Sequence, residues 1–464
     1  MSRQVTQLRP RLEAFENAMV AYRAARLDDC LVITRQYDTA AAVALYARAS
    51  FRVGRIDDVL TATSSVDDAA LDHAGAAEIL ALRGVAFALT GRVEEAEAAL
   101  TAARVRAYVS SSPPIEAECE YLTGLSAWVQ NDYKAAKEYA EKALLVGLNI
   151  PQWYGDHVSS AVVSVENVHA RALDMLGNVA ALNEDYREQA RYLTQAVELL
   201  ERCTVGDIYA EAVILFSLSA LVRDLDLPSV AAFLRERVDA IAWTQDLASF
   251  EFGIRRNLGW CEALHGNHVG ALRAFRESAD VAPSVLGRIA AIVDRSHLSR
   301  EISEKTTAAE ELDYALRLSE RVNWSSIRGE EIFTLYELAQ NVAARDAGRA
   351  RQLFEKYVAV RRNLSPLLFG QRNRRLRASE CFANATISKA EGDRQRATSL
   401  FDEAFVIWTS IGYDWQAASA AAELAELTGE ERYLAFAAAE TEKRPNSWLA
   451  RRLKALASRE LCLN

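Results

Sequence analysis

The chain has 464 residues, of which 54 are basic and 64 acidic, and its formal net charge is −10. This acidic balance argues against a protein that coats nucleic acid along its length, and we expect no direct nucleic-acid binding. Only 8 prolines and 20 glycines interrupt a chain that is 50% hydrophobic. No sustained alternation of apolar and polar residues indicates a sheet, so the sequence predicts an all-helical body.

The lack of a recognisable targeting segment and the pattern of the cysteines both indicate the same compartment. Residues 1–12 contain no long apolar stretch, and no segment reaches the roughly 18 uninterrupted apolar residues of a membrane helix. The six cysteines are scattered and form no C-x-x-C pair, a pattern typical of reduced thiols in a core. We therefore expect a cytoplasmic protein without membrane contact.

The first predicted elements are N-terminal capping helices over residues 1–40. Apolar side chains recur there at alternating steps of four and three, at Leu8, Leu12, Phe15, Met19 and Tyr22. Such a stripe either seals the first repeat or contacts a helix of another chain. A homodimer through the terminal helices is therefore the alternative to a purely capping role.

Residues 41–440 are predicted to form a helical repeat, because one spacing begins at each of Gly84, Gly124, Gly177 and Gly259. A turn residue follows at offset 7, a Val, Tyr or His at offset 9, and mostly small or apolar residues at offsets 12, 16 and 19. A small first residue lets the first helix of a pair approach the second, and Gly or Asn at offset 7 accepts the left-handed conformation that ends the first helix. The last three offsets form the inner stripe of the second helix.

Weaker copies continue this pattern, with starts at Ala47, Ser219, Ser296, Leu338, Ala385 and Ala422. The starts are about 42 residues apart on average, longer than the roughly 34 residues of the common helix-pair repeat, so longer helices or turns must absorb the excess. The longest step contains Asn149-Ile150-Pro151. The clearest loop signal is Ser-Ser-Ser-Pro-Pro at residues 110–114, which we expect between two helix pairs.

These residues resemble the tetratricopeptide repeat. The resemblance implies an all-α, right-handed α-α superhelical solenoid of about ten helix pairs. A C-terminal capping helix is expected over residues 441–464, and the continuous repeat favours one elongated body. The stretch from Ala170 to Leu200 also resembles the repeat arms of maltose-activator-type bacterial transcription regulators. Neither their ATPase module nor their DNA-binding helix-turn-helix is recognisable in this sequence.

Motifs of common enzymes are missing from the sequence. There is no G-x-x-x-x-G-K-[ST] phosphate loop, no H-E-x-x-H and no G-x-S-x-G. Glu262, His265 and His268 are the nearest metal-like group, but Gly266-Asn267 places them at the end of a helix, where packing of His268 is favoured over metal binding. We therefore predict no catalytic residue, no metal site and no cofactor; an enzyme built on a helical toroid is the less favoured alternative.

The resemblance also implies where a partner would bind. In tetratricopeptide repeats the first helix of each pair lines the concave groove, and residues near the small opening residue project into it. Carried over to this sequence, the groove-lining residues are Tyr121, Trp128, Arg171, Asp174, Asn178, Arg223, Arg256 and Trp260. Aromatic side chains beside Arg and Asn suit a peptide, because they stack on it and hydrogen-bond to its backbone. For Trp128 and Trp260, packing between long helices is an equal alternative.

A cluster of arginines on this acidic background is the second candidate site. The segment from 361 to 377 contains no acid, and its arginines are Arg361, Arg362, Arg372, Arg374, Arg375 and Arg377. The favoured interpretation is a solvated surface or pairing with acidic helices of the same chain. The alternative is a site for an acidic protein partner, a nucleotide or a nucleic-acid phosphate.

A solenoid normally works through an extended surface rather than a catalytic pocket. We therefore predict a non-enzymatic scaffold or regulatory adaptor that binds a protein or peptide in its concave groove. The main alternative is a ligand- or peptide-sensing transcription regulator that acts with a separate DNA-binding partner.

Overall fold

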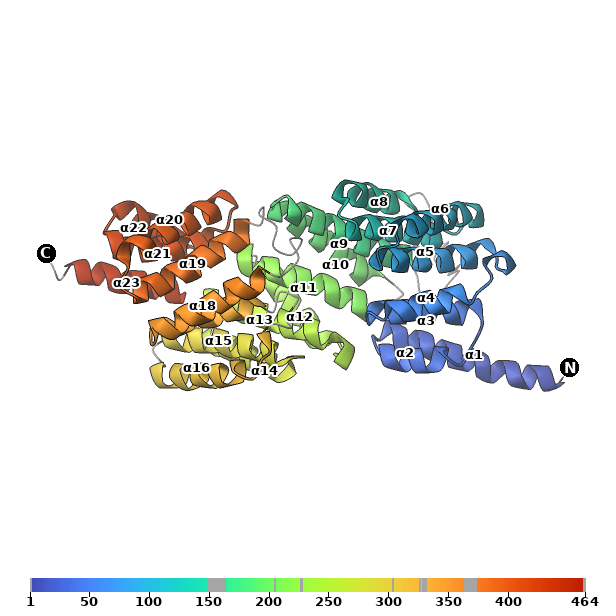
Figure 1. The fold of residues 1–464 in the computed structure, drawn as a ribbon, viewed down its shortest axis with the longest axis horizontal. Coiled ribbons are helices and arrows are strands. Elements are labelled where there is room, and N and C mark those ends of the chain that lie inside the picture. Colours follow the sequence, from blue (N-terminus) through green and yellow to red (C-terminus); the bar gives the residue numbers. More distant parts are fainter. Residues whose placement is uncertain are drawn as a thin grey trace. The chain divides into compact units, whose positions relative to one another are not determined.

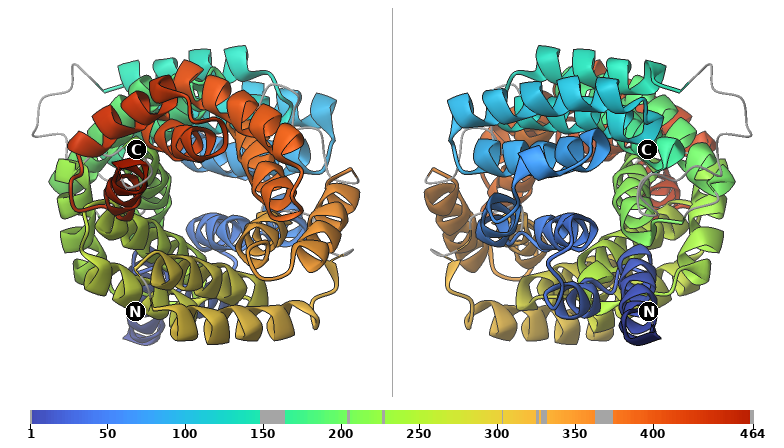
Figure 2. Two further views of the ribbon diagram at one scale, coloured as in Figure 1. Left: turned by 90° about the vertical axis from the view of Figure 1, so that its left-hand side faces the viewer. Right: turned by 90° about the vertical axis from the view of Figure 1, so that its right-hand side faces the viewer.

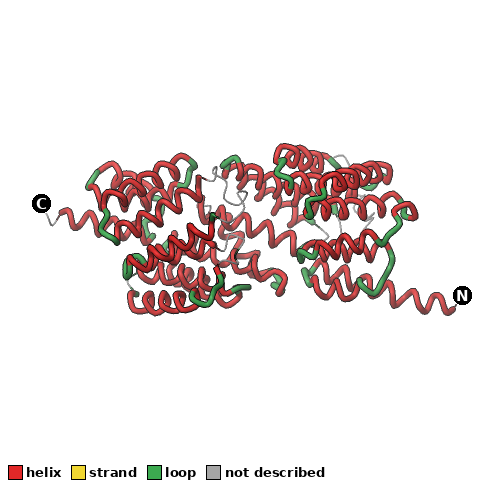
Figure 3. The backbone as a smooth tube through the Cα atoms, viewed as in Figure 1, coloured by secondary structure: helices red, strands yellow, loops and turns green. Residues whose placement is uncertain are grey.

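The computed structural model describes residues 2–147, 164–203, 206–225, 228–302, 304–324, 327, 332–362 and 374–461. Over these ranges the chain consists of helices joined by turns and contains no strand (Figure 3). The all-α class predicted from the sequence is thereby confirmed. The predicted connection at Asn149-Ile150-Pro151, together with Arg372, lies outside the described residues.

The helices group into two compact units (Figure 1). Unit 1 comprises Met1–Leu218 and Ile241–Leu247, and unit 2 comprises Ser219–Ala240 and Ala248–Asn464. The boundary falls inside α11 (Ile208–Leu225), at the weakly marked repeat of Ser219, and not at a linker. The sequence pattern by itself does not predict this division.

The other helices of unit 1 are α1 (Ser2–Arg23), α2 (Leu27–Thr34), α3 (Ala40–Arg52), α4 (Ile56–Ser64), α5 (His73–Leu89), α6 (Val93–Ser110), α7 (Pro113–Val129), α8 (Tyr133–Leu145), α9 (Val165–Leu182) and α10 (Tyr186–Arg202). Those of unit 2 are α12 (Pro228–Ala240), α13 (Ala248–Leu264), α14 (His268–Val281), α15 (Val285–Glu301), α16 (Lys305–Ser319), α17 (Phe333–Val342), α18 (Ala347–Arg361), α19 (Arg374–Ala390), α20 (Arg394–Ser410), α21 (Asp414–Thr428), α22 (Glu431–Glu442) and α23 (Trp448–Leu461).

Successive helix pairs stack within each unit: helices of similar colour, which are close in the sequence, lie side by side (Figures 1 and 2). The odd-numbered helices also contact the odd-numbered helix of the next pair: α3 with α5, α5 with α7 and α7 with α9 in unit 1, and α13 with α15, α15 with α17 and α17 with α19 in unit 2. Within the described ranges, even-numbered helices make no comparably extensive contact with one another. The odd-numbered helices therefore form the inner layer of each stack, the tetratricopeptide-like arrangement, and each predicted repeat start lies on one of them.

Close approach within a helix pair explains the repeated small residue. A Cβ atom on Gly84 would lie 2.6 Å from Cγ of Leu100, and one on Gly259 would lie 2.6 Å from Cε1 of Phe275. Both partners stand at offset 16 and are buried. The small residue on the first helix and the large one on the second thus form a single packing unit.

The turn residue at offset 7 adopts the predicted left-handed conformation. Its φ is +78° at Gly91, +66° at Asn131, +59° at Glu184 and +83° at Gly266. The second helix begins two residues later, at Val93, Tyr133, Tyr186 and His268. From its spacing, the side chain at offset 9 is expected to fill the space beneath this turn, but Val93 is 46% exposed and does not do so.

The inner stripe of the second helix is buried as predicted. In unit 1, Ala96 and Ala103 are fully buried, and Leu100 and Ala103 belong to a core that includes Val85. In unit 2, Phe275 shares a core with Trp448 and Leu449 of α23. The last helix of this unit therefore contributes to the same core as α14, which is far from it in sequence. The predicted loop at residues 110–114 is also present, since α6 ends at Ser110 and α7 begins at Pro113.

Candidate functional site

Four charged residues form a continuous chain of ion pairs on the inner helices of unit 1. Arg48 of α3 donates from Nε to Oε1 of Glu78 on α5 at 2.8 Å and from Nη1 to Oε1 of Glu118 on α7 at 2.6 Å. Arg171 of α9 donates to both oxygens of Glu118, with an Nη1–Oε1 distance of 3.4 Å. We call Glu78, Arg48, Glu118 and Arg171 the ion-pair chain.

Glu118 is the centre of the ion-pair chain. Its side chain is 2% exposed, and that of Arg48 is 5% exposed. Burial by itself would raise the pKa of Glu118, but attraction to Arg171 and Arg48 outweighs burial and lowers this pKa to about 2. Glu118 therefore stays ionised, and both guanidinium groups depend on it for charge compensation.

Arg52 stands one helical turn after Arg48 and is held by a different set of residues. Its Nη2 donates to Oδ2 of Asp207 at 2.5 Å. Its guanidinium group lies over the rings of Tyr22 and Tyr209, 4.1 Å and 4.9 Å from their centres. The hydroxyl of Tyr209 donates to the carbonyl of Arg52 at 3.2 Å. Two aromatic rings and one carboxylate therefore fix the plane of this guanidinium.

Three buried polar atoms of this region have no hydrogen-bond partner among the described residues: Nη2 of Arg48, Nη1 of Arg52 and Oδ1 of Asp174. Nδ2 of Asn178 donates to the other oxygen of Asp174 at 3.3 Å. Burial raises the pKa of Asp174 to about 6, against the hydrogen bonds of Ser217 and Asn178, which lower it. The site thus offers two guanidinium donors and one carboxyl acceptor on α3 and α9.

Unit 1 brings together four of the residues predicted from the sequence. Tyr121, Arg171, Asp174 and Asn178 lie on α7 and α9, and the guanidinium of Arg171 lies 4.8 Å from the ring centre of Tyr121. Burial raises the pKa of Tyr121 to about 12, and the charges of Arg171, Asp174, Glu118 and Arg52 also act on its hydroxyl. The tyrosine therefore contacts the ion-pair chain through Arg171 and lies within electrostatic range of Asp174.

Trp128 belongs to the same helix as Tyr121 but contacts a different part of the repeat. Its ring meets that of Tyr133, the first residue of α8, edge to face at 5.0 Å. This contact lies within one helix pair, at the turn. The arrangement favours the packing interpretation of Trp128.

The remaining predicted groove residues lie in unit 2. Arg256 on α13 donates to Asp294 on α15 at 2.5 Å and to Glu337 on α17 at 2.7 Å. Arg223 donates to Oδ1 of Asn257 at 3.1 Å. The predicted residues are thus divided between two units, and Arg256 is an ion-pair partner of its own inner helices.

Trp260 packs inside unit 2. Its ring lies 5.4 Å from that of Phe275 and 5.6 Å from that of His297. Nδ1 of His297 lies 3.2 Å from Oδ1 of Asn341. Burial, and then the charge of Arg300, lowers the pKa of His297. These contacts favour core packing for Trp260.

The arginines of the basic cluster have several partners within unit 2. Arg361 donates to Glu380 at 2.5 Å, and Arg377 donates to Glu403 at 2.6 Å. Arg374 donates to Ser410 at 3.3 Å, and Arg375 lies 5.5 Å from the ring centre of Tyr413. Arg362 is exposed at the end of α18. Pairing with acidic helices of the same chain, the favoured interpretation, thus occurs at Arg361 and Arg377, whereas a site for an acidic partner stays a prediction.

The sequence interpretation missed Arg48, Arg52, Glu118 and Asp207. A signal for part of this set was present, since Glu78, Glu118 and Arg171 each precede a repeat glycine by six residues. Equivalent positions of adjacent inner helices lie side by side, so opposite charges at one offset predict an ion pair. Nothing comparable links Arg52 to Asp207, which lies 155 residues further along the chain.

Among the described residues, no group of three or more His, Cys, Asp and Glu side chains could hold a metal ion. Of the helices in the described ranges, none combines the length and apolar character needed to cross a membrane.

Comparisons with known proteins give similarities of fold. No family model and no curated protein matches the sequence. A Rap protein complexed with competence and sporulation factor is similar over 82% of this chain and 99% of that chain, at 11% identity and a TM-score of 0.47. The apo form of the quorum sensor NprR from B. thuringiensis matches 91% of this chain and 99% of its own, at 13% identity and a TM-score of 0.43. Yeast Tom70 is similar over 96% of this chain and 99% of its own, at 13% identity and a TM-score of 0.39. The assignment of this chain to the tetratricopeptide-like solenoids rests on its own helix pairs.

Proposed function

We propose that this chain is a non-enzymatic helical-repeat scaffold that binds a peptide or an extended protein segment through the inner helices of unit 1. The observation that carries this proposal is the set of buried atoms Arg48 Nη2, Arg52 Nη1 and Asp174 Oδ1, which lack hydrogen-bond partners in the described part of the chain. A buried polar group without a partner costs roughly 1–3 kcal/mol, and a ligand that supplies the partner removes that cost.

A peptide backbone matches these atoms in chemistry. Its carbonyl groups accept hydrogen bonds from the two guanidinium groups, and its N–H groups donate to Asp174. Hydrogen bonds to a charged donor are stronger than those between neutral groups. Because Arg52 is already fixed between Tyr22 and Tyr209, binding would require little further ordering of this side chain.

Affinity selection from a random peptide library tests the proposal, with the full chain as bait and mass spectrometry to identify the retained peptides. Asp174→Asn removes the acceptor charge at constant shape. The double variant Arg52→Gln/Asp207→Asn removes the guanidinium without leaving Asp207 charged. We expect each to weaken the binding of the selected peptides by about tenfold, the equivalent of about 1.4 kcal/mol.

The matched control is Arg191→Gln, since Arg191 lies on the outer helix α10, is 51% exposed and pairs with Glu188. It should bind the selected peptides as the wild type does. Failure of the library to yield peptides that distinguish the inner variants from this control would contradict the proposal. Co-purification separates the alternatives: a stoichiometric protein partner supports a scaffold, a bound metabolite supports a sensing regulator, and turnover without a partner supports an enzyme.

A further inference from the structure

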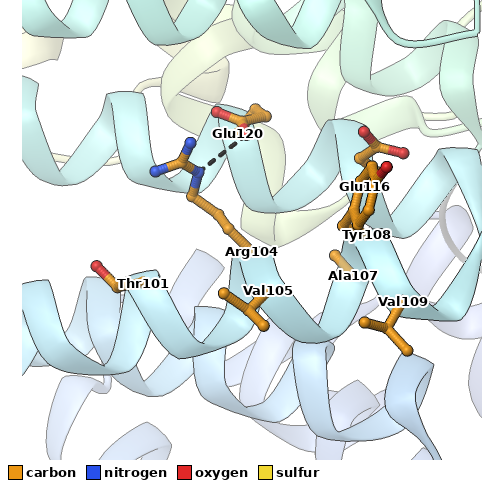
Figure 4. A pocket seen from close by; sticks show the side chains of 8 residues that line it. All are labelled: Thr101, Arg104, Val105, Ala107, Tyr108, Val109, Glu116 and Glu120. Carbon is orange, nitrogen blue, oxygen red and sulfur yellow. Dashed lines mark hydrogen bonds and ion pairs between the residues drawn. The ribbon is translucent and has the colours of Figure 1, made fainter.

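A groove lies between α6 and α7 of unit 1 (Figure 4). It encloses about 360 Å³, with Val105, Tyr108 and Val109 of α6 and Glu116 and Glu120 of α7 among its lining residues. The two acids flank Glu118 at a distance of two residues. A step of two turns a helix by roughly 200°, so these acids face away from the inner layer that Glu118 faces.

The α6 side of the groove is apolar and open. Val105 is 60% exposed, Tyr108 is 75% exposed and Val109 is 53% exposed. The neighbouring Ala107 is fully buried and belongs to the floor. Three large side chains exposed together on one helix form a contiguous apolar surface, which in a folded protein marks a contact site more often than isolated exposed residues do.

The α7 side of the groove is acidic and only partly compensated. Nε of Arg104 donates to Oε1 of Glu120 at 2.9 Å. Oε2 of Glu120 is buried and has no hydrogen-bond partner among the described residues. Burial, and then the charge of Glu120, raises the pKa of Glu116. Arg104 therefore compensates Glu120, whereas no ion pair holds Glu116 among the described residues, which leaves the groove short of one positive charge.

We propose that the α6–α7 groove docks a segment of another protein that places a lysine or arginine side chain between apolar side chains. The cation would reach Glu116 and the second oxygen of Glu120, next to the exposed ring of Tyr108, whose face also attracts a positive charge. The flanking apolar side chains would cover Val105 and Val109. This surface does not overlap the inner site of the proposed function, so either proposal can fail without the other.

Charge complementarity favours this occupant over two others. In a symmetric dimer the same patch contacts itself, which would bring Glu116 and Glu120 against their own copies, an arrangement that repulsion disfavours. A membrane surface carries anionic lipid, which the carboxylates would repel. The patch is also small, so we expect a weak, exchanging contact rather than a permanent complex.

Phage display of random peptides on the immobilised full chain tests the proposal. Wild type should enrich sequences with Lys or Arg beside apolar residues, and the binding of a synthetic copy of an enriched peptide should weaken as salt rises. Glu116→Lys should weaken the binding of this synthetic peptide at least about tenfold, or by roughly 1.4 kcal/mol, and should shift the enriched sequences toward Asp or Glu. Val105→Ser, at an exposed position, should also weaken the binding of the peptide.

Glu97→Lys is the matched control, because Glu97 is exposed on α6 and does not line the groove. It makes the same charge change on the same unit, and circular dichroism would establish that all three variants keep their helices. Enrichment of peptides without a basic residue, equal effects of Glu116→Lys and Glu97→Lys, or no enrichment at all would overturn the proposal. Concentration-dependent self-association that Glu116→Lys strengthens would assign the groove to a second copy instead, and would also overturn it.

Discussion

Glu118 and Arg171 hold the same position in two successive repeats, six residues before Gly124 and Gly177, and they form a two-point ion pair between α7 and α9. The repeat that builds the fold therefore also places the charges that connect its inner helices. Arg48 uses the same carboxylate from α3. Glu118 thus pairs with two guanidinium groups, one of which, that of Arg48, also pairs with Glu78.

Replacing Glu118 with Gln should destabilise unit 1 strongly. The substitution keeps the shape but leaves Arg48 and Arg171 without their shared carboxylate, and breaking a buried pair from one side costs about 3–5 kcal/mol. Chemical denaturation followed by circular dichroism measures the loss. Glu138→Gln is the control, since Glu138 is 54% exposed and lies 3.9 Å from Lys134; it should cost less than about 1 kcal/mol.

The lowered pKa of Glu118 also predicts how the stability of the chain depends on pH. The pKa of Glu118 is lowered from 4.5 to about 2, so the folded state binds this proton less readily than the unfolded state does. Its contribution is therefore fully present above the unfolded pKa and is lost as pH falls toward about 2. Wild type should lose more stability than Glu118→Gln over this window in denaturation series. Parallel pH profiles for the two proteins would contradict the assignment.

The pKa shift of Asp174 predicts the opposite dependence of stability on pH. Its pKa is raised from 3.8 to about 6, so the folded state favours the neutral acid, and the associated stability is lost as pH rises through about 6. Asp174→Asn should therefore be more stable than wild type at pH 7, by about 1–3 kcal/mol at about 1.4 kcal/mol per pKa unit. The difference should vanish near pH 4. A variant less stable than wild type at both pH values would show that the carboxylate is compensated in the folded chain.

The parts of the fold that depend on local sequence could be predicted. The glycines at the repeat starts, the left-handed turns and the buried Ala96 and Ala271 all follow from spacing within one helix pair. The candidate site was predictable where it lies on the repeat, as at Tyr121 and Arg171. Arg52 was not, because its partner Asp207 belongs to a distant helix, and spacing along one helix does not specify which distant helix it meets. The acidic-partner role of the basic cluster and the link to transcription stay predictions.

The last prediction separates two reasons for a glycine at a repeat start. At Gly259 an added Cβ would lie 2.6 Å from Cε1 of Phe275, whose ring is fully buried and packs against Trp260. At Gly177 the atom nearest to an added Cβ is Cγ of Leu193, at 3.5 Å. Alanine gains about 1 kcal/mol over glycine inside a helix, but overpacking costs about 1–3 kcal/mol. Gly177→Ala should therefore stabilise the chain by up to about 1 kcal/mol.

Gly259→Ala should do the reverse, because the buried ring of Phe275 has little room to move, and we expect a net loss of about 1–2 kcal/mol once the helix gain is subtracted. Urea denaturation of both variants beside wild type measures the two signs in one experiment. The double variant Gly259→Ala/Phe275→Leu should recover part of the loss, since the smaller side chain vacates the space that the new methyl group needs. Equal stabilisation by the two alanines would mean that close approach to the residue at offset 16 does not require glycine at this position.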